Sequence, residues 1–291
     1  MLVAAALFAV MGACVKLAAT RYSIAELVLY RALVGVAALA IYAHLIGRPL
    51  GTPVPWLHFR RGAIGTVSLG LWFFAMTLLP LGTATALNYT SSLFLAAFTL
   101  GAALHARRPV EARLTATVAL GFVGVLLLLR PSFSAVQWLG AAAGLASGML
   151  SALAYWNVRE LALNGEPEWR IVFYFSLSAL ALGVGGSLLT GFSTHTPAGV
   201  ALLAGVSITA LLAQLAMTRA FSRGRALLTA NLQYSSIIFA SILGVVIFAD
   251  RIAPAGWVGM AIIIGSGMLA TWLAHRRRPP PIEAPLTVKP Q

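Results

Sequence analysis

Long apolar stretches separated by short polar connections run along almost the whole chain. Each stretch has roughly 20 residues, which is the length that a helix needs to cross a ~30 Å hydrocarbon core. The first stretch lacks a basic leading region and is too long for a signal-peptide core, so we expect it to be a retained span. The pattern predicts an all-α integral membrane protein with ten transmembrane helices, at about residues 1–20, 24–46, 61–79, 83–104, 112–130, 135–156, 169–190, 197–218, 226–248 and 255–274.

The connections between these stretches alternate in charge. Most of the 20 Lys and Arg residues follow the second, fourth, sixth and eighth stretches or lie in the tail. Because cytoplasmic loops carry an excess of Lys and Arg, both termini are predicted to be cytoplasmic, in a multi-pass protein of the bacterial inner membrane. The basic residues assigned to that side are Arg48, Arg60, Arg61, Arg107, Arg108, Arg113, Arg159, Arg170, Arg219, Arg223, Arg225, Arg276, Arg277, Arg278 and Lys289.

Composition supports a membrane protein and excludes several other classes. The chain is 60% hydrophobic and 9% charged, whereas soluble domains carry about 25% charge. The net charge of +13 comes from basic residues at span ends, so the expected partner is the lipid bilayer and not a nucleic acid. Cys14 is the single cysteine, and we expect no disulfide, metal or cofactor. Residues 275–291 are polar and Pro-rich, which predicts a disordered cytoplasmic tail.

Two short strings recur in the two halves of the chain. FAMTLLPLG at 74–82 resembles LAMTRAFSRG at 215–224, and YTSSLF at 89–94 resembles YSSIIF at 234–239. The separation corresponds to five spans, and an odd number of spans makes the second copy enter the membrane from the opposite side. The sequence therefore predicts two inverted five-helix repeats, at residues 1–130 and 135–274. In carriers of this kind the substrate site lies near the midplane between the repeats.

These features resemble the drug/metabolite transporter superfamily and its EamA-type members. The resemblance covers residues 1–274 and includes Lys16 late in the first span, Arg31 in the second, and glycine-rich fifth and tenth spans with GFVG from Gly121 and GMAIIIGSG from Gly259. Within the superfamily the chain is similar overall to the bacterial aromatic amino acid exporters. The resemblance implies a ten-helix exporter of small metabolites.

Polar and aromatic side chains form stripes at helical spacing inside the spans of both halves. An unsatisfied polar group costs several kcal/mol in hydrocarbon, so these residues should face another helix or a water-filled pathway. Hydrogen bonding between helices is an alternative role for the Ser, Asn and Gln residues. The residues predicted to bind substrate near the midplane are Trp72, Met76, Asn88, Tyr89, Ser92, Tyr155, Gln214, Asn231, Tyr234 and Ser235.

Charged residues within the spans gather near the predicted periplasmic surface. Lys16, Glu26 and Arg31 form a candidate cluster, which either joins the first two spans or meets a substrate carboxylate. The resemblance implies an acid after the fourth and ninth spans; Asp250 matches the second position, but 105–109 reads HARRP, so no transport role is assigned there. No Asp, Glu or His falls at mid-membrane, which favours facilitated diffusion or exchange over proton antiport.

A carrier of small amphipathic metabolites fits these observations, and the resemblance implies export of aromatic amino acids by alternating access. Other amino acids, purines or drugs are alternative substrates. An intramembrane enzyme is not expected, because the sequence has no HExxH motif and no paired mid-span carboxylates. A channel would need a ring of carbonyls or charges, which two unlike halves form poorly. We expect the protein to act on a small-molecule substrate as a monomer.

Overall fold

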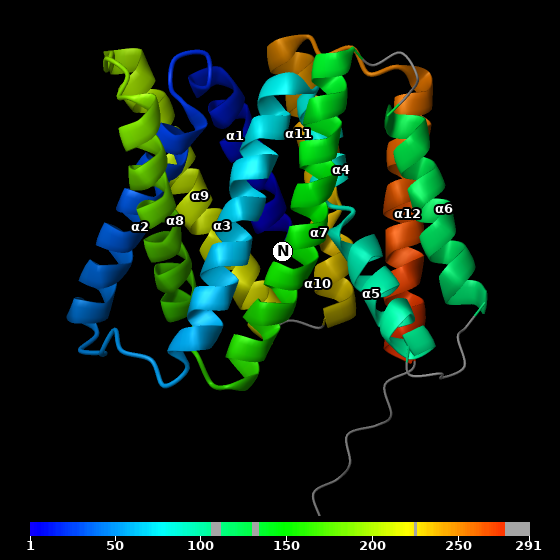
Figure 1. The fold of residues 1–291 in the computed structure, drawn as a ribbon, viewed down its shortest axis with the longest axis horizontal. Helices are drawn as coiled ribbons and strands as arrows, with labels where there is room; N and C mark the ends of the chain where they lie inside the picture. The colour runs from blue at the N-terminus through cyan, green and yellow to red at the C-terminus, as the bar shows by residue number, and fades with distance from the viewer. Residues whose placement is uncertain (106–111, 130–133, 224–225, 277–291) are drawn as a thin grey trace, which may run out of the picture.

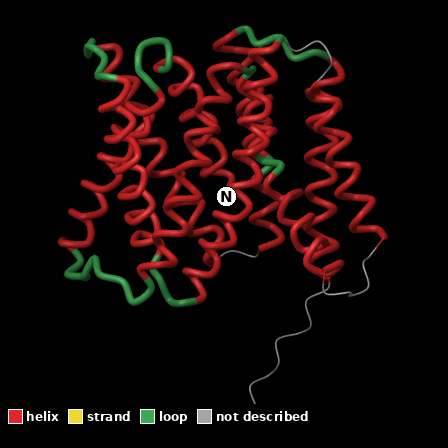
Figure 2. Tube along the Cα trace, viewed as in Figure 1, coloured by secondary structure: helices red, strands yellow, loops and turns green. Residues whose placement is uncertain are grey.

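The computed structural model describes residues 1–105, 112–129, 134–223 and 226–276. These residues form helices that stand side by side and run alternately up and down (Figure 1), and Figure 2 shows only helix and loop among them. Among the described residues, seven helical segments are long and apolar enough to cross a membrane, and one of them, Asn231–Phe248, runs through the turn between the last two helices before the C-terminal one. The helices are α1 (Leu2–Ala18), α2 (Ile24–Leu45), α3 (Pro55–Leu78), α4 (Leu81–Asn88), α5 (Ser91–His105), α6 (Ala112–Leu129), α7 (Ala135–Leu163), α8 (Glu168–Thr190), α9 (Pro197–Arg223), α10 (Ala226–Gln233), α11 (Ser235–Phe248) and α12 (Pro254–Arg276).

The predicted fourth and ninth spans are each broken into two helices, so the expectation of two unbroken helices is wrong. The breaks lie between α4 and α5 and between α10 and α11. At the first break the Thr90 hydroxyl donates to the Leu87 carbonyl at 2.6 Å, and at the second the Ser235 hydroxyl donates to the Leu232 carbonyl at 2.6 Å. A hydroxyl that bonds to a nearby carbonyl competes with the regular helical pattern. Both breaks fall on the recurring YTSSLF and YSSIIF strings.

Several helices extend beyond the apolar stretches that predicted them. α3 begins at Pro55, where a proline suits the first helical position. Arg60 on α3 pairs with Glu160 on α7, and Arg223 at the end of α9 pairs with Glu168 at the start of α8. These polar contacts at the rim let the helices continue past the hydrocarbon-length core, which hydrophobicity alone does not reveal.

The two ends of the chain differ from expectation in small ways. α1 begins near the mid-height of the bundle (Figure 1). At the other end, α12 includes His275 and Arg276, so the predicted start of the tail is too early by these two residues. The rest of the predicted tail lies outside the described residues, as do Arg107, Arg108 and Arg225.

Helices from the two halves alternate across the bundle. The most extensive contacts join α2 to α8, α6 to α12, α3 to α7 and α1 to α9. The predicted repeat matches α1, α2, α3 and α6 with α7, α8, α9 and α12. Exchanging each helix for its match gives the same four pairs. Where α6 meets α12, Gly124 and Gly259 bring the backbones together, since a Cβ added to Gly259 would lie 2.7 Å from the Gly124 carbonyl oxygen. This close crossing accounts for the glycine-rich fifth and tenth spans.

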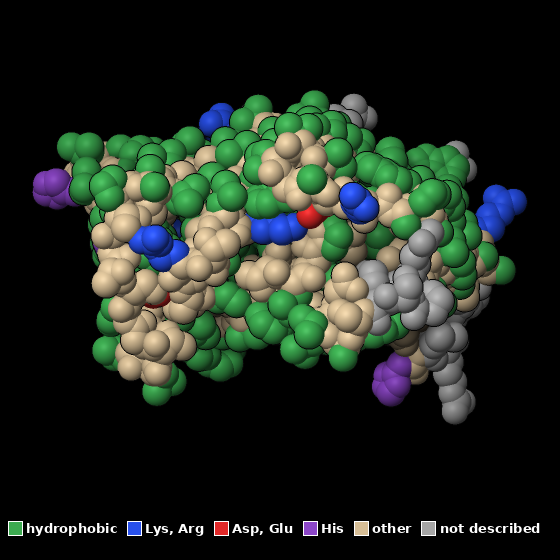
Figure 3. Space-filling model, turned by 90° about the horizontal axis from the view of Figure 1, so that it is seen from above, with side chains coloured by type: hydrophobic (Ala, Val, Ile, Leu, Met, Phe, Trp, Pro, Cys, Tyr) green, Lys and Arg blue, Asp and Glu red, His purple; other side chains and the backbone are tan. Residues whose placement is uncertain are grey.

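The two ends of the bundle carry different connections. The 46–54 and 164–167 connections lie at the lower end in Figure 1, and the 19–23, 191–196 and 249–253 connections lie at the upper end. Seen from above, separate Lys and Arg side chains lie among hydrophobic and other groups on the upper face (Figure 3). The upper end is therefore the end that the charge pattern of the sequence predicts to be poor in basic residues.

Candidate functional site

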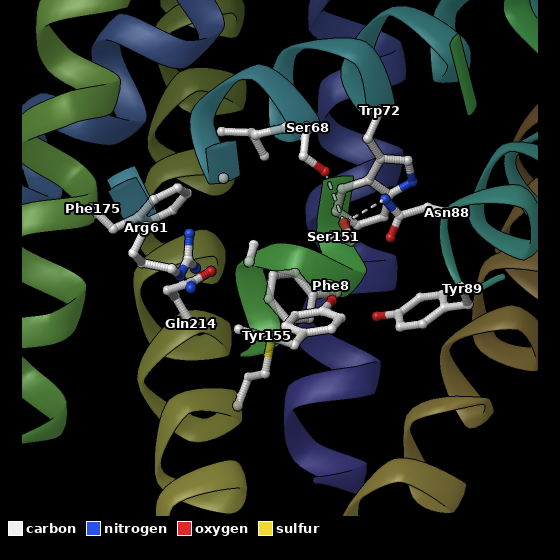
Figure 4. Close-up of a pocket in the computed structure, with 14 residues that line it drawn as sticks. Phe8, Arg61, Ser68, Trp72, Asn88, Tyr89, Ser151, Tyr155, Phe175 and Gln214 are labelled. Atoms are coloured by element: carbon white, nitrogen blue, oxygen red, sulfur yellow. Dashed lines mark hydrogen bonds between the residues drawn. The ribbon is translucent and has the colours of Figure 1, made fainter. Parts of the chain in front are cut away.

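A cavity lies between the two halves, inside the bundle (Figure 4). Its walls come from α1, α3 and α4 of the first half and from α7, α8 and α9 of the second, and Tyr89 lies at the break between α4 and α5. Both halves therefore contribute to one chamber. The described lining residues are Phe8, Arg61, Gly65, Ser68, Leu69, Trp72, Asn88, Tyr89, Ser151, Ala154, Tyr155, Phe175, Gln214 and Met217.

A buried hydrogen-bond network forms one polar wall of the cavity. The Ser68 hydroxyl contacts the Ser151 hydroxyl at 2.8 Å and donates to the Ser147 carbonyl at 2.9 Å. The Asn88 amide nitrogen donates to the hydroxyls of Ser147 at 2.6 Å and Ser151 at 3.2 Å. These bonds join α3, α4 and α7, as the helix-joining alternative for polar residues predicts. The Asn88 amide nitrogen is therefore engaged within the protein.

Aromatic rings form another part of the lining. Trp72 makes edge-to-face contacts with Phe8 and Tyr89, with ring centroids 6.1 and 6.5 Å apart. Tyr155 stacks on Phe221 at 5.2 Å. The Trp72 indole is 6% exposed, and its N–H has no hydrogen-bond partner among the described residues. These rings give the cavity an apolar surface with one free donor.

Arg61 is a site residue that the sequence does not predict. The charge pattern places it in a cytoplasmic connection, but α3 begins six residues earlier and carries it inside the bundle, where it is 3% exposed. Its guanidinium carbon lies 4.4 Å from the centre of the Phe175 ring, and that of Arg31 lies 5.6 Å from the same ring. Gly65, one turn along α3, makes room for the side chain, because an added Cβ would lie 1.8 Å from Arg61 Nη1. In the sequence, the glycine four residues after this arginine does not by itself distinguish a buried arginine from an exposed one.

Neither buried arginine has an acidic partner among the described residues. Removing a charge from water costs several kcal/mol, and a cation–π contact returns only about 0.5–2 kcal/mol. Arg31 and Arg61 both lie against the Phe175 ring, so two cations share this part of the interior. The described carboxylates are engaged elsewhere: Asp250 with Lys16, Glu160 with Arg60, Glu166 with Arg170 and Thr52, Glu168 with Arg223, and Glu26 with Ser23 and Ser193.

The structure brings only some of the predicted binding residues to the cavity. Met76 is fully buried against Gly12 of α1 and is absent from the described lining. The hydroxyls of Ser92 and Tyr234 contact each other, which joins α5 to the second helix break. Ser235 uses its hydroxyl at that break, and the Asn231 amide oxygen is buried without a partner. The predicted residues that line the cavity are Trp72, Asn88, Tyr89, Tyr155 and Gln214.

The predicted charge cluster does not form. Lys16 donates to Asp250 at 2.9 Å and to the Leu79 carbonyl at 3.2 Å. Glu26 caps the start of α2 through Ser23 and accepts hydrogen bonds from Ser193. Arg31, one and a half turns farther along α2, faces Phe175 instead. The sequence pattern did not reveal this ion pair because the partner of Lys16 lies 234 residues away.

No group of three metal-ligating side chains gathers among the described residues.

Comparisons with known proteins agree with this architecture. The model of the EamA-like transporter family matches residues 1–130. A pseudopaline exporter of Pseudomonas aeruginosa is 28% identical over 80% of each chain. A riboflavin transporter of Rhizobium johnstonii is 26% identical over 79% of this chain and 74% of its own. A crystal structure with 21% identity superposes on 94% of this chain and 96% of its own with a TM-score of 0.64, which shows a shared fold. Residues 1–130 therefore match the EamA-like transporter family, and the two relatives that align with most of the chain are named as transporters and not as enzymes.

Proposed function

We propose that the protein is a ten-span carrier of two inverted five-span repeats, which exports small amphipathic metabolites, aromatic amino acids among them, by alternating access. The matching helix breaks and the exchangeable helix pairing support the repeat. In carriers, discontinuous helices at corresponding positions of two repeats mark the substrate site. The break at Tyr89 reaches the cavity, and the break at Tyr234 is linked to α5 through Ser92.

The observation that carries this proposal is the aromatic cavity shared by the two halves. Small-molecule sites are mostly apolar with a few placed polar groups, and this cavity offers the rings of Phe8, Trp72 and Tyr155 beside the amides of Asn88 and Gln214. A substrate ring can pack on these aromatic side chains while its polar head meets the Gln214 amide. Alternating exposure of this cavity would result from one half rocking against the other.

We also propose how the protein is oriented in the membrane and how its transport is driven. We place the lower end of the bundle, where the described part of α12 ends, on the cytoplasmic side of a bacterial inner membrane, and the N-terminus begins near the mid-height of the bundle. None of the described lining residues is Asp, Glu or His. A buried carboxylate relay is the usual means of coupling transport to protons, so we propose facilitated diffusion or exchange by a monomer.

Counterflow in proteoliposomes tests this function. Vesicles loaded with unlabelled substrate would be offered labelled phenylalanine, tryptophan, leucine, adenine or riboflavin, with and without an imposed pH gradient. We expect aromatic substrates to accumulate faster than leucine, at rates that do not depend on the gradient. Accumulation only when a pH gradient is present would contradict the uncoupled mechanism. Equal rates for leucine and the aromatic substrates would contradict the assigned substrate class.

A further inference from the structure

We infer that Arg61, with Arg31 behind it, forms a carboxylate-binding subsite, so that the transporter recognises its substrate as an apolar or aromatic carboxylate. The inference rests on the proposed function, because it takes the cavity to be the substrate site. It goes beyond that function by naming the charged group that the site selects and the residue that selects it.

The buried polar atoms left unpaired in the cavity wall are all donors. Among the described lining residues they are Nε and Nη1 of Arg61 and the indole Nε1 of Trp72. Buried donors in native proteins nearly always have an acceptor, and an exception calls for a missing partner. A ligand with acceptor atoms beside Arg61 would supply that partner for its two unpaired N–H groups. Each unpaired N–H of the Arg61 guanidinium can donate to a carboxylate oxygen, and the charge of both groups strengthens such a bond.

The charge of the cavity lining also favours an anionic ligand. Arg61 is the only charged residue in the described lining, and a second cation, Arg31, lies against the same Phe175 ring. A carboxylate would relieve the repulsion between the two guanidinium groups. An ammonium group would find no acid in this lining. The site should therefore favour an aromatic anion over the corresponding zwitterion and should reject the amine.

The geometry also sets the orientation of the ligand. Arg61 and Gln214 lie together at one end of the cavity, whereas Trp72 and Tyr89 lie at the other (Figure 4). The carboxylate would bind between Arg61 and the Gln214 amide, and the ring would extend toward Trp72. Gly65 keeps the guanidinium folded along α3, since any side chain there would occupy its place.

Ligand binding to the purified full-length protein tests the subsite without depending on transport. Labelled 3-phenylpropionate would be bound to protein in detergent and displaced by unlabelled 3-phenylpropionate, 3-phenylpropanamide, phenylalanine or phenethylamine. We expect the neutral amide to compete at least about tenfold more weakly than the acid, because it lacks the charge that Arg61 would pair with. Phenylalanine should lie between the two, and phenethylamine should not compete. An amide or amine that competes as well as the acid would overturn the inference.

Two neighbouring arginines supply a matched pair of variants. Arg61→Gln should abolish the preference for acid over amide, and Arg61→Lys should retain part of it because the charge remains while the guanidinium N–H groups are lost. Arg60→Gln should keep the full preference, since Arg60 pairs with Glu160 outside the cavity. Unchanged acid binding in folded Arg61→Gln protein would refute the subsite. If the acid binds through Arg61 but no aromatic substrate is transported, the subsite stands and the proposed function fails.

Discussion

At the upper end of the bundle a partly buried cation has a carboxylate partner, whereas the cation in the central cavity has none among the described residues. At the upper end, Lys16 and Asp250 pair at 2.9 Å, and Asp250 also accepts a hydrogen bond from the Leu81 amide at 2.8 Å. In the cavity, Arg61 is more deeply buried than Lys16, yet no described carboxylate faces it. A charge held for structure has its partner within the protein. A buried charge without one indicates that the partner arrives from outside.

Neutralising the cavity arginine should have the largest effect on transport. Removing one member of a buried charge pair costs about 2–5 kcal/mol, so Arg61→Gln should lower the transport rate at limiting substrate by a factor of roughly 30 or more. Arg60→Gln should stay within about twofold of wild type, because a half-exposed ion pair contributes little. Initial rates in proteoliposomes, normalised to folded protein, would measure both. Similar losses in the two variants would remove the distinction between cavity and rim.

Neutralising the acid at the upper end should act mainly on stability. Asp250→Asn leaves Lys16 without its partner and weakens the bond to the Leu81 amide, so we expect about 1–3 kcal/mol of destabilisation. Adding Lys16→Met should restore part of this loss. The matched control is Glu160→Gln at the half-exposed pair with Arg60, expected to cost under about 1 kcal/mol. Thermal unfolding in detergent would measure the stability of these variants. An Asp250→Asn variant as stable as wild type would show that the ion pair of Lys16 and Asp250 does not stabilise the fold.

Truncating the cavity tryptophan should change selectivity. Aromatic pairs contribute about 0.5–1.5 kcal/mol beyond their buried area, so Trp72→Ala should reduce transport of phenylalanine relative to leucine by about two- to twelvefold. The measurement is the ratio of the two initial rates. If both rates fell by the same factor, Trp72 would pack or gate the cavity rather than recognise the ring.

Truncating a lipid-facing tryptophan should have the smallest effect. Trp257 is 46% exposed at the upper end of α12, as expected for an interfacial anchor. Trp257→Ala should leave the ratio of phenylalanine to leucine transport unchanged and should lower only the yield of inserted protein. A shift in the ratio comparable to that of Trp72→Ala would mean that aromatic residues act on selectivity without lining the cavity.

Much of the fold follows from hydrophobic length, because that length alone determines where a helix can cross a bilayer. The helix breaks at Tyr89 and Tyr234 do not follow from it, since one hydroxyl bonded to a carbonyl leaves the apolar pattern intact. The ring and amide residues of the cavity, such as Trp72 and Gln214, are predictable because they are large and lie deep in their spans. Arg61 is not, because a charge near a span end looks the same whether it faces water or the bundle interior.

The most direct test of the central claim, that the shared cavity is the substrate site, is substrate protection of a cavity cysteine. Ala154 lines the cavity and is 3% exposed, so Ala154→Cys in a Cys14→Ala background places a small thiol there. Gly51→Cys, in an exposed connection with no atom within 4 Å of its Cβ position, is the control. We predict that a transported aromatic substrate slows maleimide labelling of the cavity cysteine at least about fivefold, and that Arg61→Gln abolishes this protection while the control labels at one rate throughout. Labelling of the cavity cysteine at the same rate with and without saturating substrate would contradict the account.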